Sequence, residues 1–408
     1  MNPSPTADGE RTVLLLGTLD TKGDELAFLR KRLRDAGVGV LLADVGTLEP
    51  ATVEADFTRE QVGAEAGVDV EGLRAAVAGM ADAAAALARR LYGEGRIHGV
   101  LSAGGSGNTA IATAAMQALP VGVPKLMVST MAAGDTSDYV GGVDVTMMAS
   151  VTDVAGINSI SARILANAAG AMAGMVNAPA PRVEDGRPLV AATMFGVTTP
   201  CVTRAREELE RRGYEVLVFH ATGTGGKAME ALVEGGLLSG VLDVTTTELC
   251  DDLVGGVLSA GPARLEAAGR AGVPQVVSLG ALDMVNFGAR DSVPPKFEDR
   301  NLYVHNPSVT LMRTTPEECA ELGRRIAGKL AAATGPTSLF VPLGGVSMID
   351  VEGQPFHDPE ADAALFEALR EGLEGSSVEL IELEHTVNDE EFADAMVDKL
   401  DAYLGGAR

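Results

Sequence analysis

Short, uninterrupted apolar runs recur along this chain, and each ends in a polar or glycine-rich turn that opens a helical segment. Residues 12–16, 38–43 and 97–103 are examples. Strands that are apolar at every position are typical of a parallel sheet covered by helices on both faces. Because a strand, a helix and a second strand in this order form a parallel βαβ unit, the sequence predicts an α/β fold.

The same order returns after a linker rich in proline and charge at residues 178–188. Residues 189–219 follow the pattern of residues 12–43, with a strand, a turn, a helix and a second strand. A chain of 408 residues is also long enough for two domains. We predict two Rossmann-like domains, residues 1–180 and 187–408, each a mostly parallel sheet flanked by helices, related as a diverged internal repeat.

Charge and composition restrict the classes of partner. The net charge of −25 argues against nucleic acid or an anionic membrane, since both need a positive field. The three widely spaced cysteines favour a reducing compartment over a disulfide framework. The first ten residues lack an apolar secretory segment, and residues 146–176, which include Asp153, fit a small-residue helix better than a membrane span. We therefore predict a cytoplasmic protein without membrane segments.

The turn after the 97–103 strand is the strongest candidate for chemistry. It reads Gly104, Gly105, Ser106, Gly107, Asn108 and Thr109. Glycines between a strand and a helix leave backbone N–H groups free of covering side chains, so an anion can approach closely. On an acidic protein, backbone amides suit a phosphate better than a basic patch does. The turn predicts phosphate binding, and a purely structural tight turn is the alternative.

Other loops of the first half follow strand ends and carry further candidates for ligand binding. These are Gly17, Thr18, Asp20, Thr21, Lys22, Asp44, Thr130, Gly134 and Asp135. The carboxyl ends of parallel strands meet at one edge of a sheet, so we expect these residues to surround the phosphate. Asp20 and Asp135 are candidate Mg²⁺ ligands, Lys22 a phosphate partner and Asp44 a ribose partner. For Asp20 and Asp135 the alternative is helix capping or turn formation. For Lys22 the alternative is a solvated surface position.

The second half offers a different set of polar loops. Its counterpart of the glycine turn, residues 243–248, has no glycine, which restricts predicted phosphate binding to the first half. Residues 223–227 do not complete a Walker A motif. Glu248, Asp283 and Asn286 fall at strand ends and are candidates for a second polar cleft. His220 and His305 fall at loop positions of this half and are considered for acid–base chemistry, although structural roles fit them better, and the role of the loop at residues 344–347 stays open.

Four segments read together resemble a family of ATP-binding proteins that includes a plant tobamovirus-resistance protein. They are GTLDTKG (17–23), GGSGNT (104–109), STMAAGD (129–135) and DVAGIN (153–158). The resemblance extends over nearly the whole chain, including PLGGVS (342–347) and PFHDP (355–359). It implies two α/β domains, a homodimer, and ATP with Mg²⁺ in the N-terminal domain. The antiviral activity is not carried over, because a partner surface cannot be matched residue by residue from these motifs.

We therefore expect an adenine-nucleotide-binding protein whose ATP phosphates lie on residues 104–109. Two uses of ATP stay open. One is an ATP-dependent ligase or kinase acting on a small metabolite bound between the domains. The other is a nucleotide-stabilised module that binds a protein partner without turnover. A third interpretation, an NAD-dependent oxidoreductase, is weakened because the glycine turn does not satisfy GxGxxG.

Overall fold

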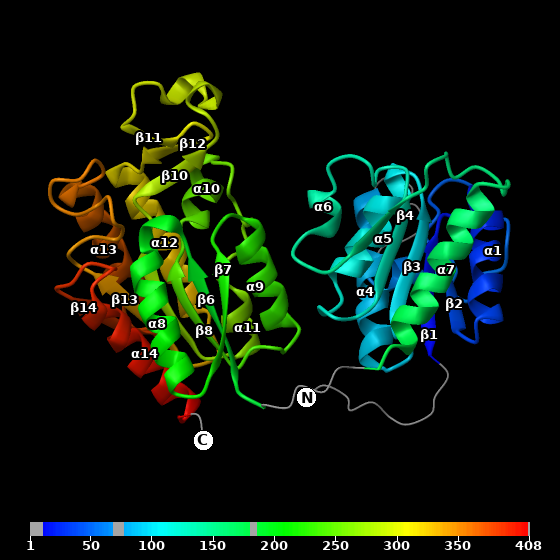
Figure 1. Ribbon diagram of the computed structural model, residues 1–408, viewed down its shortest axis with the longest axis horizontal. Coiled ribbons are helices and arrows are strands. Elements are labelled where there is room, and N and C mark those ends of the chain that lie inside the picture. The colour runs from blue at the N-terminus through cyan, green and yellow to red at the C-terminus, as the bar shows by residue number, and fades with distance from the viewer. Residues whose placement is uncertain (1–10, 68–76, 180–185, 407–408) are drawn as a thin grey trace. The chain divides into compact units, whose positions relative to one another are not determined.

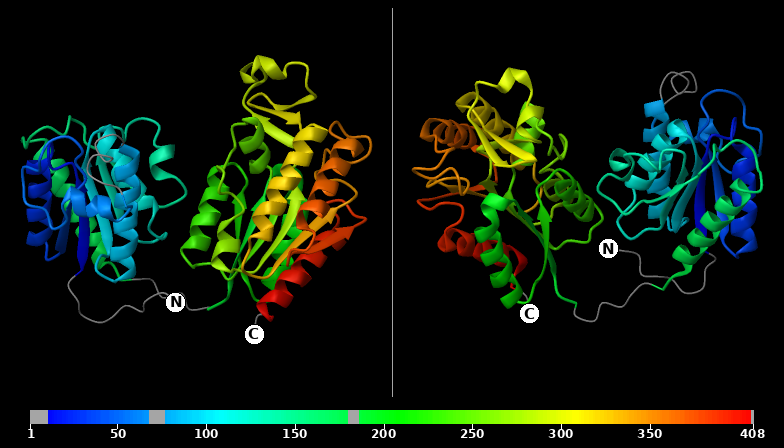
Figure 2. Two further views of the ribbon diagram at one scale, coloured as in Figure 1. Left: turned by 180° about the vertical axis from the view of Figure 1, so that it is seen from behind. Right: turned by 45° about the horizontal axis from the view of Figure 1, so that its top comes forward.

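The computed structural model describes residues 11–67, 77–179 and 186–406. It divides the chain into two compact units, Met1–Arg182 and Val183–Arg408, which we call the N-terminal unit and the C-terminal unit. Each unit is built on its own parallel sheet with helices on both faces (Figures 1 and 2). The two units are described separately below.

The N-terminal unit alternates strands and helices. In chain order its elements are β1 (Thr12–Gly17), α1 (Gly23–Asp35), β2 (Gly39–Asp44), α2 (Arg59–Ala64), α4 (Val77–Gly93), β3 (Gly99–Gly104), α5 (Ser106–Gln117), β4 (Lys125–Ser129), α6 (Ser137–Val140), β5 (Thr146–Ala149) and α7 (Ser161–Asn177). The strands form a five-stranded sheet in the order β2-β1-β3-β4-β5, and every neighbouring pair is parallel.

Strand β1 shows why its sequence is apolar throughout. Leu14 and Leu16 pack on the face covered by α4 and α5, whereas Val13 and Leu15 pack on the face covered by α1 and α7. Successive side chains of a strand point to opposite faces, so a strand between two helical layers buries both sets. All four side chains are fully buried. The lack of a side chain at Gly99 of β3 allows α7 to approach closely, since a Cβ on Gly99 would lie 2.9 Å from Val176 Cγ1.

The C-terminal unit has a larger parallel sheet. Its elements outside the antiparallel insertion are β6 (Leu189–Met194), η1 (Gly196–Thr198), α8 (Thr199–Arg211), β7 (Glu215–His220), α9 (Thr224–Glu234), β8 (Gly240–Thr245), α10 (Glu248–Val254), α11 (Ala267–Ala271), β9 (Gln275–Gly280), α12 (Pro316–Ala331), β13 (Thr337–Pro342), α13 (Pro359–Leu373), β14 (Glu379–Leu383) and α14 (Glu390–Leu404). The six strands are parallel in the order β14-β13-β9-β8-β6-β7.

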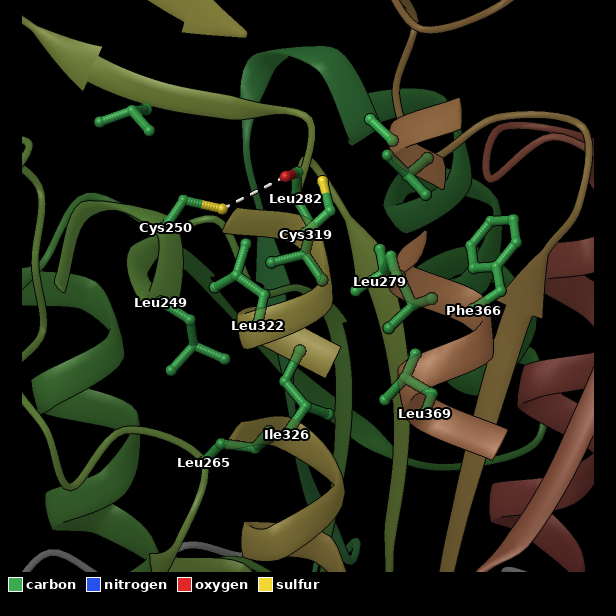
Figure 3. Packing of buried hydrophobic residues seen from close by; sticks show 14 of the residues in the cluster. Leu249, Cys250, Leu265, Leu279, Leu282, Cys319, Leu322, Ile326, Phe366 and Leu369 are labelled. Atoms are coloured by element: carbon green, nitrogen blue, oxygen red, sulfur yellow. Dashed lines mark hydrogen bonds between the residues drawn. The ribbon is translucent and has the colours of Figure 1, made fainter. Parts of the chain in front are cut away.

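Two helical layers cover this sheet. Helices α8 and α14 pack on one face, where Phe340 and Phe392 meet edge to face. Helices α10, α12 and α13 pack on the other face, and Figure 3 shows Leu322 and Ile326 of α12 beside Leu369 of α13. A capping box between Thr315 and Glu318 fixes the start of α12, and Pro316 occupies its first position.

A three-stranded antiparallel sheet is inserted between β9 and α12. Its strands are β10 (Met284–Phe287), β11 (Leu302–Asn306) and β12 (Val309–Arg313), in the order β10-β12-β11, with the short 3₁₀ turns η2 (Arg290–Ser292) and η3 (Pro295–Phe297) before β11. This sheet differs from the irregular proline-rich stretch expected at residues 291–307. Pro294 and Pro295 precede β11 and Pro307 follows it, and β11 has no alternation of buried and exposed residues that would mark a strand in the sequence.

The two parallel sheets share one strand order. In the N-terminal unit the first strands lie as β2-β1-β3-β4, and in the C-terminal unit their counterparts lie as β7-β6-β8-β9. The predicted α/β fold, with mostly parallel sheets flanked by helices in two domains, is confirmed. The shared order is also what a diverged internal repeat requires.

Two expectations for the first half were wrong in detail. Residues 146–176 do not form one helix: β5 occupies the beginning and α7 begins only at Ser161. Apolar residues without period-2 alternation gave no sign of an edge strand there. The sequence also predicts an acidic, irregular insertion at residues 49–70 and an alanine-rich helix at residues 70–92. The insertion contains the helix α2, and the alanine-rich helix α4 is described from Val77 onward, so its expected start lies outside the described residues.

Candidate functional site

The candidate site of the N-terminal unit lies where the chain changes faces of the sheet. The helix after β1 is α1, which packs on one face, and the helix after β3 is α5, which packs on the other. Strands β1 and β3 are neighbours in register, with Leu16 opposite Ser102, and Ser102 Oγ donates a hydrogen bond of 2.8 Å to Leu16 O. In doubly wound sheets, ligands bind in the crevice beyond such a pair of strand ends.

Glycine at position 104 is required by close packing in the turn after β3. A Cβ there would lie 2.6 Å from Nδ2 of Asn108, which donates hydrogen bonds to Ser102 Oγ at 2.9 Å and to Ala103 O at 3.0 Å. Oδ1 of Asn108 is buried and has no hydrogen-bond partner among the described residues. The Asn108 side chain therefore fixes the turn to the end of β3 by hydrogen bonds.

The outer part of this turn is open. Gly105 is the N-cap of α5, and no side chain caps the helix there. Ser106 and Gly107 are exposed, and a Cβ on Gly107 would meet no atom within 4 Å. Among the described residues, no side chain thus competes for the N–H groups that begin α5, and these groups carry the positive end of the helix dipole.

The loop after β4 is tied to the same turn. Thr109 Oγ1 lies 2.7 Å from Ser129 Oγ, and Thr130 N donates to Gly104 O at 3.3 Å. Thr130 is exposed, and its Oγ1 is 3.9 Å from where a Cβ on Gly105 would lie. A hydroxyl is thereby placed at the rim of the open turn.

Gly134 and Asp135 lie farther along the β4 loop and are both exposed. Asp135 Oδ1 accepts hydrogen bonds from Ser137 Oγ at 2.7 Å and from Ser137 N at 3.0 Å. These bonds lower the pKa of the Asp135 carboxyl. In the structure Asp135 therefore forms the turn before α6.

The loop after β1 is joined to the loop after β2 by carboxylates. Thr18 O accepts a hydrogen bond from Lys22 N, and the hydroxyls of Thr18 and Thr21 lie 3.1 Å apart. Asp20 Oδ2 accepts from Leu48 N and Glu49 N at 3.1 and 3.3 Å. Oδ1 of Asp20 is buried without a hydrogen-bond partner among the described residues. Asp20 thus has one oxygen in use and one unsatisfied.

Asp44 ends β2 and is buried. Its Oδ1 accepts hydrogen bonds from Gly46 N at 2.9 Å and from Leu19 N at 3.1 Å. Burial raises the pKa of Asp44, the two hydrogen bonds oppose that shift, and the nearby Asp20 charge adds to it. Asp44 also lines a pocket of about 430 Å³ that includes Thr58 and Arg59. A carboxylate beside an open pocket can accept hydrogen bonds from ligand hydroxyl groups.

The corresponding crevice of the C-terminal unit, between the ends of β6 and β8, is filled by protein groups. Thr193 Oγ1 donates to Asp243 Oδ1 at 2.7 Å, and the hydroxyls of Thr198 and Thr245 lie 2.7 Å apart. Arg264 is buried among Asp243, Glu248 and Glu230. Burial lowers the pKa of Arg264, and these carboxylates raise it by more.

Glu248 of the same network also caps the N-terminus of α9. Its Oε1 accepts hydrogen bonds from Gly223 N at 2.7 Å and Gly226 N at 3.1 Å, at the beginning of α9. Residues 223–227, which do not complete a Walker A motif, thus already hold an internal carboxylate. The absence of glycine from residues 243–248 coincides with a crevice occupied by side chains.

The second polar cleft expected from Glu248, Asp283 and Asn286 is not one site. All three side chains are buried, but Glu248 binds Arg264, Asp283 binds Ser347 and Asn286 binds Asp251. His220 and His305 are exposed, but they lie in strands, at the end of β7 and within β11, and not in loops as expected. The sequence did not point to Arg264, Arg313, Asp350 or Asp362, since each meets partners distant in the chain.

Two further observations restrict the chemistry. Within residues 11–67, 77–179 and 186–406, no three His, Cys, Asp or Glu side chains gather closely enough to hold a metal ion by themselves. Over the same described ranges, no helix is both long and apolar enough to cross a membrane.

The fold and the open crevice define a two-domain α/β protein whose N-terminal doubly wound sheet has a free helix start at its switch point. Residues 11–181 match the N-terminal domain, and residues 187–404 the C-terminal domain, of the family described as Uncharacterised protein family (UPF0261). The chain belongs to this family.

Relatives match nearly the whole chain. A UPF0261 protein of Clostridium tetani is 51% identical over 396 residues, covering 96% of this chain and 98% of that protein. A UPF0261 protein of Rhizobium meliloti is 50% identical over 394 residues, covering 95% of this chain and 98% of that protein. The ToMV resistance protein Tm-1(GCR237) of Solanum lycopersicum is 41% identical over 417 residues, covering 95% of this chain and 55% of that protein. The family resemblance is confirmed, and ATP binding stays a prediction.

Proposed function

We propose that the N-terminal unit binds a magnesium-complexed adenine nucleotide, ATP, with its phosphates on the first turn of α5. The observation that supports this most strongly is the uncapped helix start with open space at Gly107. Free N–H groups at a helix N-terminus stabilise an anion through hydrogen bonds and the helix dipole. Thr130 adds an exposed hydroxyl at the rim of the turn.

The pocket beside Asp44 supports the nucleoside part of the proposal. Strand β1 lies between β2 and β3, and neighbouring strands are about 4.8 Å apart, so the ends of β2 and β3 are about 10 Å apart. A ribose bound to Asp44 and phosphates bound at α5 would thus be linked across the end of β1. Thr18 and Lys22 belong to the loop that follows β1. ATP is preferred among nucleotides because of the family resemblance.

The magnesium ion belongs to the proposal as a partner of the phosphates. Mg²⁺ on nucleotides keeps waters and takes one or two carboxylates. Asp20 fits that role, because its buried Oδ1 lacks a hydrogen-bond donor among the described residues. Asp135 fits less well, since its Oδ1 already accepts two hydrogen bonds from Ser137.

We also propose a cytoplasmic homodimer. Cys201, Cys250 and Cys319 are free thiols, as is usual in reducing compartments. Val151 and Ile160 are exposed apolar residues before α7, and a partner chain would remove them from water. Sedimentation equilibrium of the full chain measures the oligomeric state, and a monomer at all concentrations would refute the dimer.

The central experiment is a thermal-shift panel of nucleotides with and without Mg²⁺ on the full chain. At a ligand concentration about 100 times Kd, binding adds about 2.7 kcal/mol and raises the melting temperature of this unit by roughly 5–10 °C. Gly107→Asp should abolish the shift while the protein stays folded, because it places a carboxylate at the helix start where nothing obstructs it. Gly107→Asn is the matched neutral control and should retain most of the shift.

Two further variants test the metal. Asp20→Asn should remove the part of the shift that depends on Mg²⁺, whereas Asp135→Asn should leave it. ADP release by the stabilised protein would identify an ATP-dependent enzyme, and stabilisation without ADP release would identify a nucleotide-binding module. No stabilisation by any adenine nucleotide would refute the proposal.

A further inference from the structure

Two sequence segments that the proposed nucleotide site does not use meet in the C-terminal unit. PLGGVS (342–347) follows β13, and PFHDP (355–359) leads into α13. Between them is a pocket of about 200 Å³ whose wall includes Gly344, Gly345, Asp350, His357, Asp362 and Phe366. It lies beyond the carboxyl end of a parallel strand, where open α/β sheets bind ligands.

Carboxylates held by a single buried arginine form the polar wall of this pocket. Nη2 of Arg313 donates to Asp362 Oδ1 at 2.6 Å and to Asp350 Oδ1 at 3.2 Å. Nε of Arg313 donates to Phe356 O at 2.7 Å, which fixes the PFHDP segment. Asp350 Oδ2 accepts from Val346 N at 2.9 Å, which fixes the PLGGVS segment. Hydrogen bonds with Arg313 and Asp350 thus fix both segments that form the pocket.

The charges around Arg313 do not balance. Three carboxyl groups, those of Asp283, Asp350 and Asp362, face this one guanidinium. Asp283 Oδ1 is buried and has no hydrogen-bond partner among the described residues. Burial, followed by the charges of Asp283 and Asp362, raises the pKa of Asp350 to about 9. Asp350 therefore keeps its proton near neutral pH. A cation bound beside the cluster would stabilise the ionised form of this carboxyl group.

The remaining wall is apolar. Leu343, Pro359, Ala363 and Phe366 line it together with the two glycines. A volume of about 200 Å³ is below the ~300–1,000 Å³ of pockets for drug-sized ligands, so the occupant is small. Carboxylates disfavour a phosphate or carboxylate ligand. A metal ion is disfavoured because no group of three acidic or histidine ligands gathers among the described residues.

We propose that this pocket binds the ammonium group of a small organic amine, with Asp362 as its carboxylate partner, the buried Asp350 behind it, and Phe366 against its hydrocarbon part. The exposed His357 stands at the rim. This site lies within the C-terminal unit and does not depend on the proposed nucleotide site.

The test compares two probes of nearly equal shape on the full-length protein, benzylamine and benzyl alcohol, by isothermal titration calorimetry. Benzylamine should bind and benzyl alcohol should bind at least roughly tenfold more weakly, since a charged hydrogen bond is lost. Titration at pH 7 in buffers of different ionisation enthalpy should show proton release on benzylamine binding, because the cation favours ionised Asp350. The other charged or titratable groups that face this cluster or its rim are Asp283, Arg313, Cys319, His357, Asp358 and Asp362.

Variants separate a specific site from general attraction to an acidic protein. Asp362→Asn keeps an oxygen acceptor for Arg313 and should weaken benzylamine binding by roughly tenfold or more. Glu367→Gln removes an equal charge from an exposed position of α13 outside the pocket wall and should leave binding unchanged. Ala363→Phe fills the pocket from an exposed position and should block binding with all carboxylates retained.

Three results would overturn the proposal: equal binding of benzylamine and benzyl alcohol, undiminished binding in both Asp362→Asn and Ala363→Phe, or stabilisation by Mg²⁺ or Ca²⁺ of a pocket that accepts no amine. If Asp362→Asn fails to fold, Ala363→Phe decides, since its side chain enters from the surface.

Discussion

Arg264 binds Asp243 through both arms of its guanidinium, with Nη1 2.6 Å from Oδ2 and Nη2 2.7 Å from Oδ1, and both residues are only 1% exposed. Nε of the same arginine donates to Glu248 at 2.7 Å. This ion pair occupies the crevice that is open in the N-terminal unit. The same strand order therefore supports an internal network in one unit and a candidate ligand site in the other.

Replacing this arginine should destabilise the C-terminal unit strongly. Arg264→Met keeps most of the side-chain length but leaves buried carboxylates without their cation, which typically costs roughly 3–5 kcal/mol. Arg270→Met is the control, since Arg270 pairs with Glu266 at the surface and its loss should cost about 1 kcal/mol or less. Urea unfolding of the two variants measures the difference. Equal losses would contradict a structural role for the buried ion pair.

Two glycines three residues apart should respond in opposite directions. Gly104→Ala forces a Cβ to within 2.6 Å of Asn108 and should cost about 1–3 kcal/mol by overpacking. Gly107→Ala meets no atom within 4 Å in the first turn of α5 and should stabilise the unit by up to about 1 kcal/mol. Denaturant unfolding monitored on the N-terminal unit checks both values. The prediction is wrong if the two substitutions shift stability the same way.

Asp251 should make stability pH-dependent. Burial raises its pKa from the ordinary 3.8 to about 7, against the hydrogen bonds from Asn286. The folded protein therefore holds a proton that the unfolded chain releases, and the Asp251 contribution to stability is lost as pH rises from about 4 towards about 7.

Asp251→Asn should flatten that dependence. The variant should gain stability relative to wild type at pH 8 compared with pH 5. The Asn286 amide, whose Oδ1 has no partner among the described residues, can rotate to accept from the new NH₂ group. Asp291→Asn, an exposed carboxylate in η2, is the control. Parallel pH profiles for wild type and Asp251→Asn would exclude this role.

The cysteine thiols should be unreactive in the folded protein. Burial raises the pKa of Cys201 to about 12 and of Cys319 to about 11, and it also raises that of Cys250. Figure 3 shows Cys250 and Cys319 inside the hydrophobic core of the C-terminal unit. An aromatic disulfide reagent at pH 8 should label no thiol in native protein and all three in urea. Rapid labelling of native protein would show that the core opens.

The fold was largely predictable because a strand that is buried on both faces has apolar residues at consecutive positions. The runs at β1, β2 and β3 are apolar at nearly every position, and glycine marks the turn after β3. β5 was missed, since residues 146–149 lie at the sheet edge and are only partly buried or exposed. β11 was missed for the same physical reason, because an edge strand leaves one side in water.

The candidate sites were predictable only where their residues are adjacent in the chain. Gly104–Thr109 is a local motif, and these residues themselves set the backbone geometry that leaves the N–H groups of α5 open. Arg264 and Asp362 could not be found this way. Asp362 meets Arg313 from 49 positions away, and Arg264 meets Glu230 from 34 positions away, so neither pairing has a pattern in the sequence.

The open start of α5 has a consequence for mutagenesis. Its free donors are main-chain N–H groups, and no substitution except proline removes them. An alanine scan of polar side chains would therefore test Asp20, Asp44 and Thr130 and leave these donors in place. Only a substitution that changes the charge at the helix start, such as Gly107→Asp, tests their contribution, so here the informative experiment adds a charge.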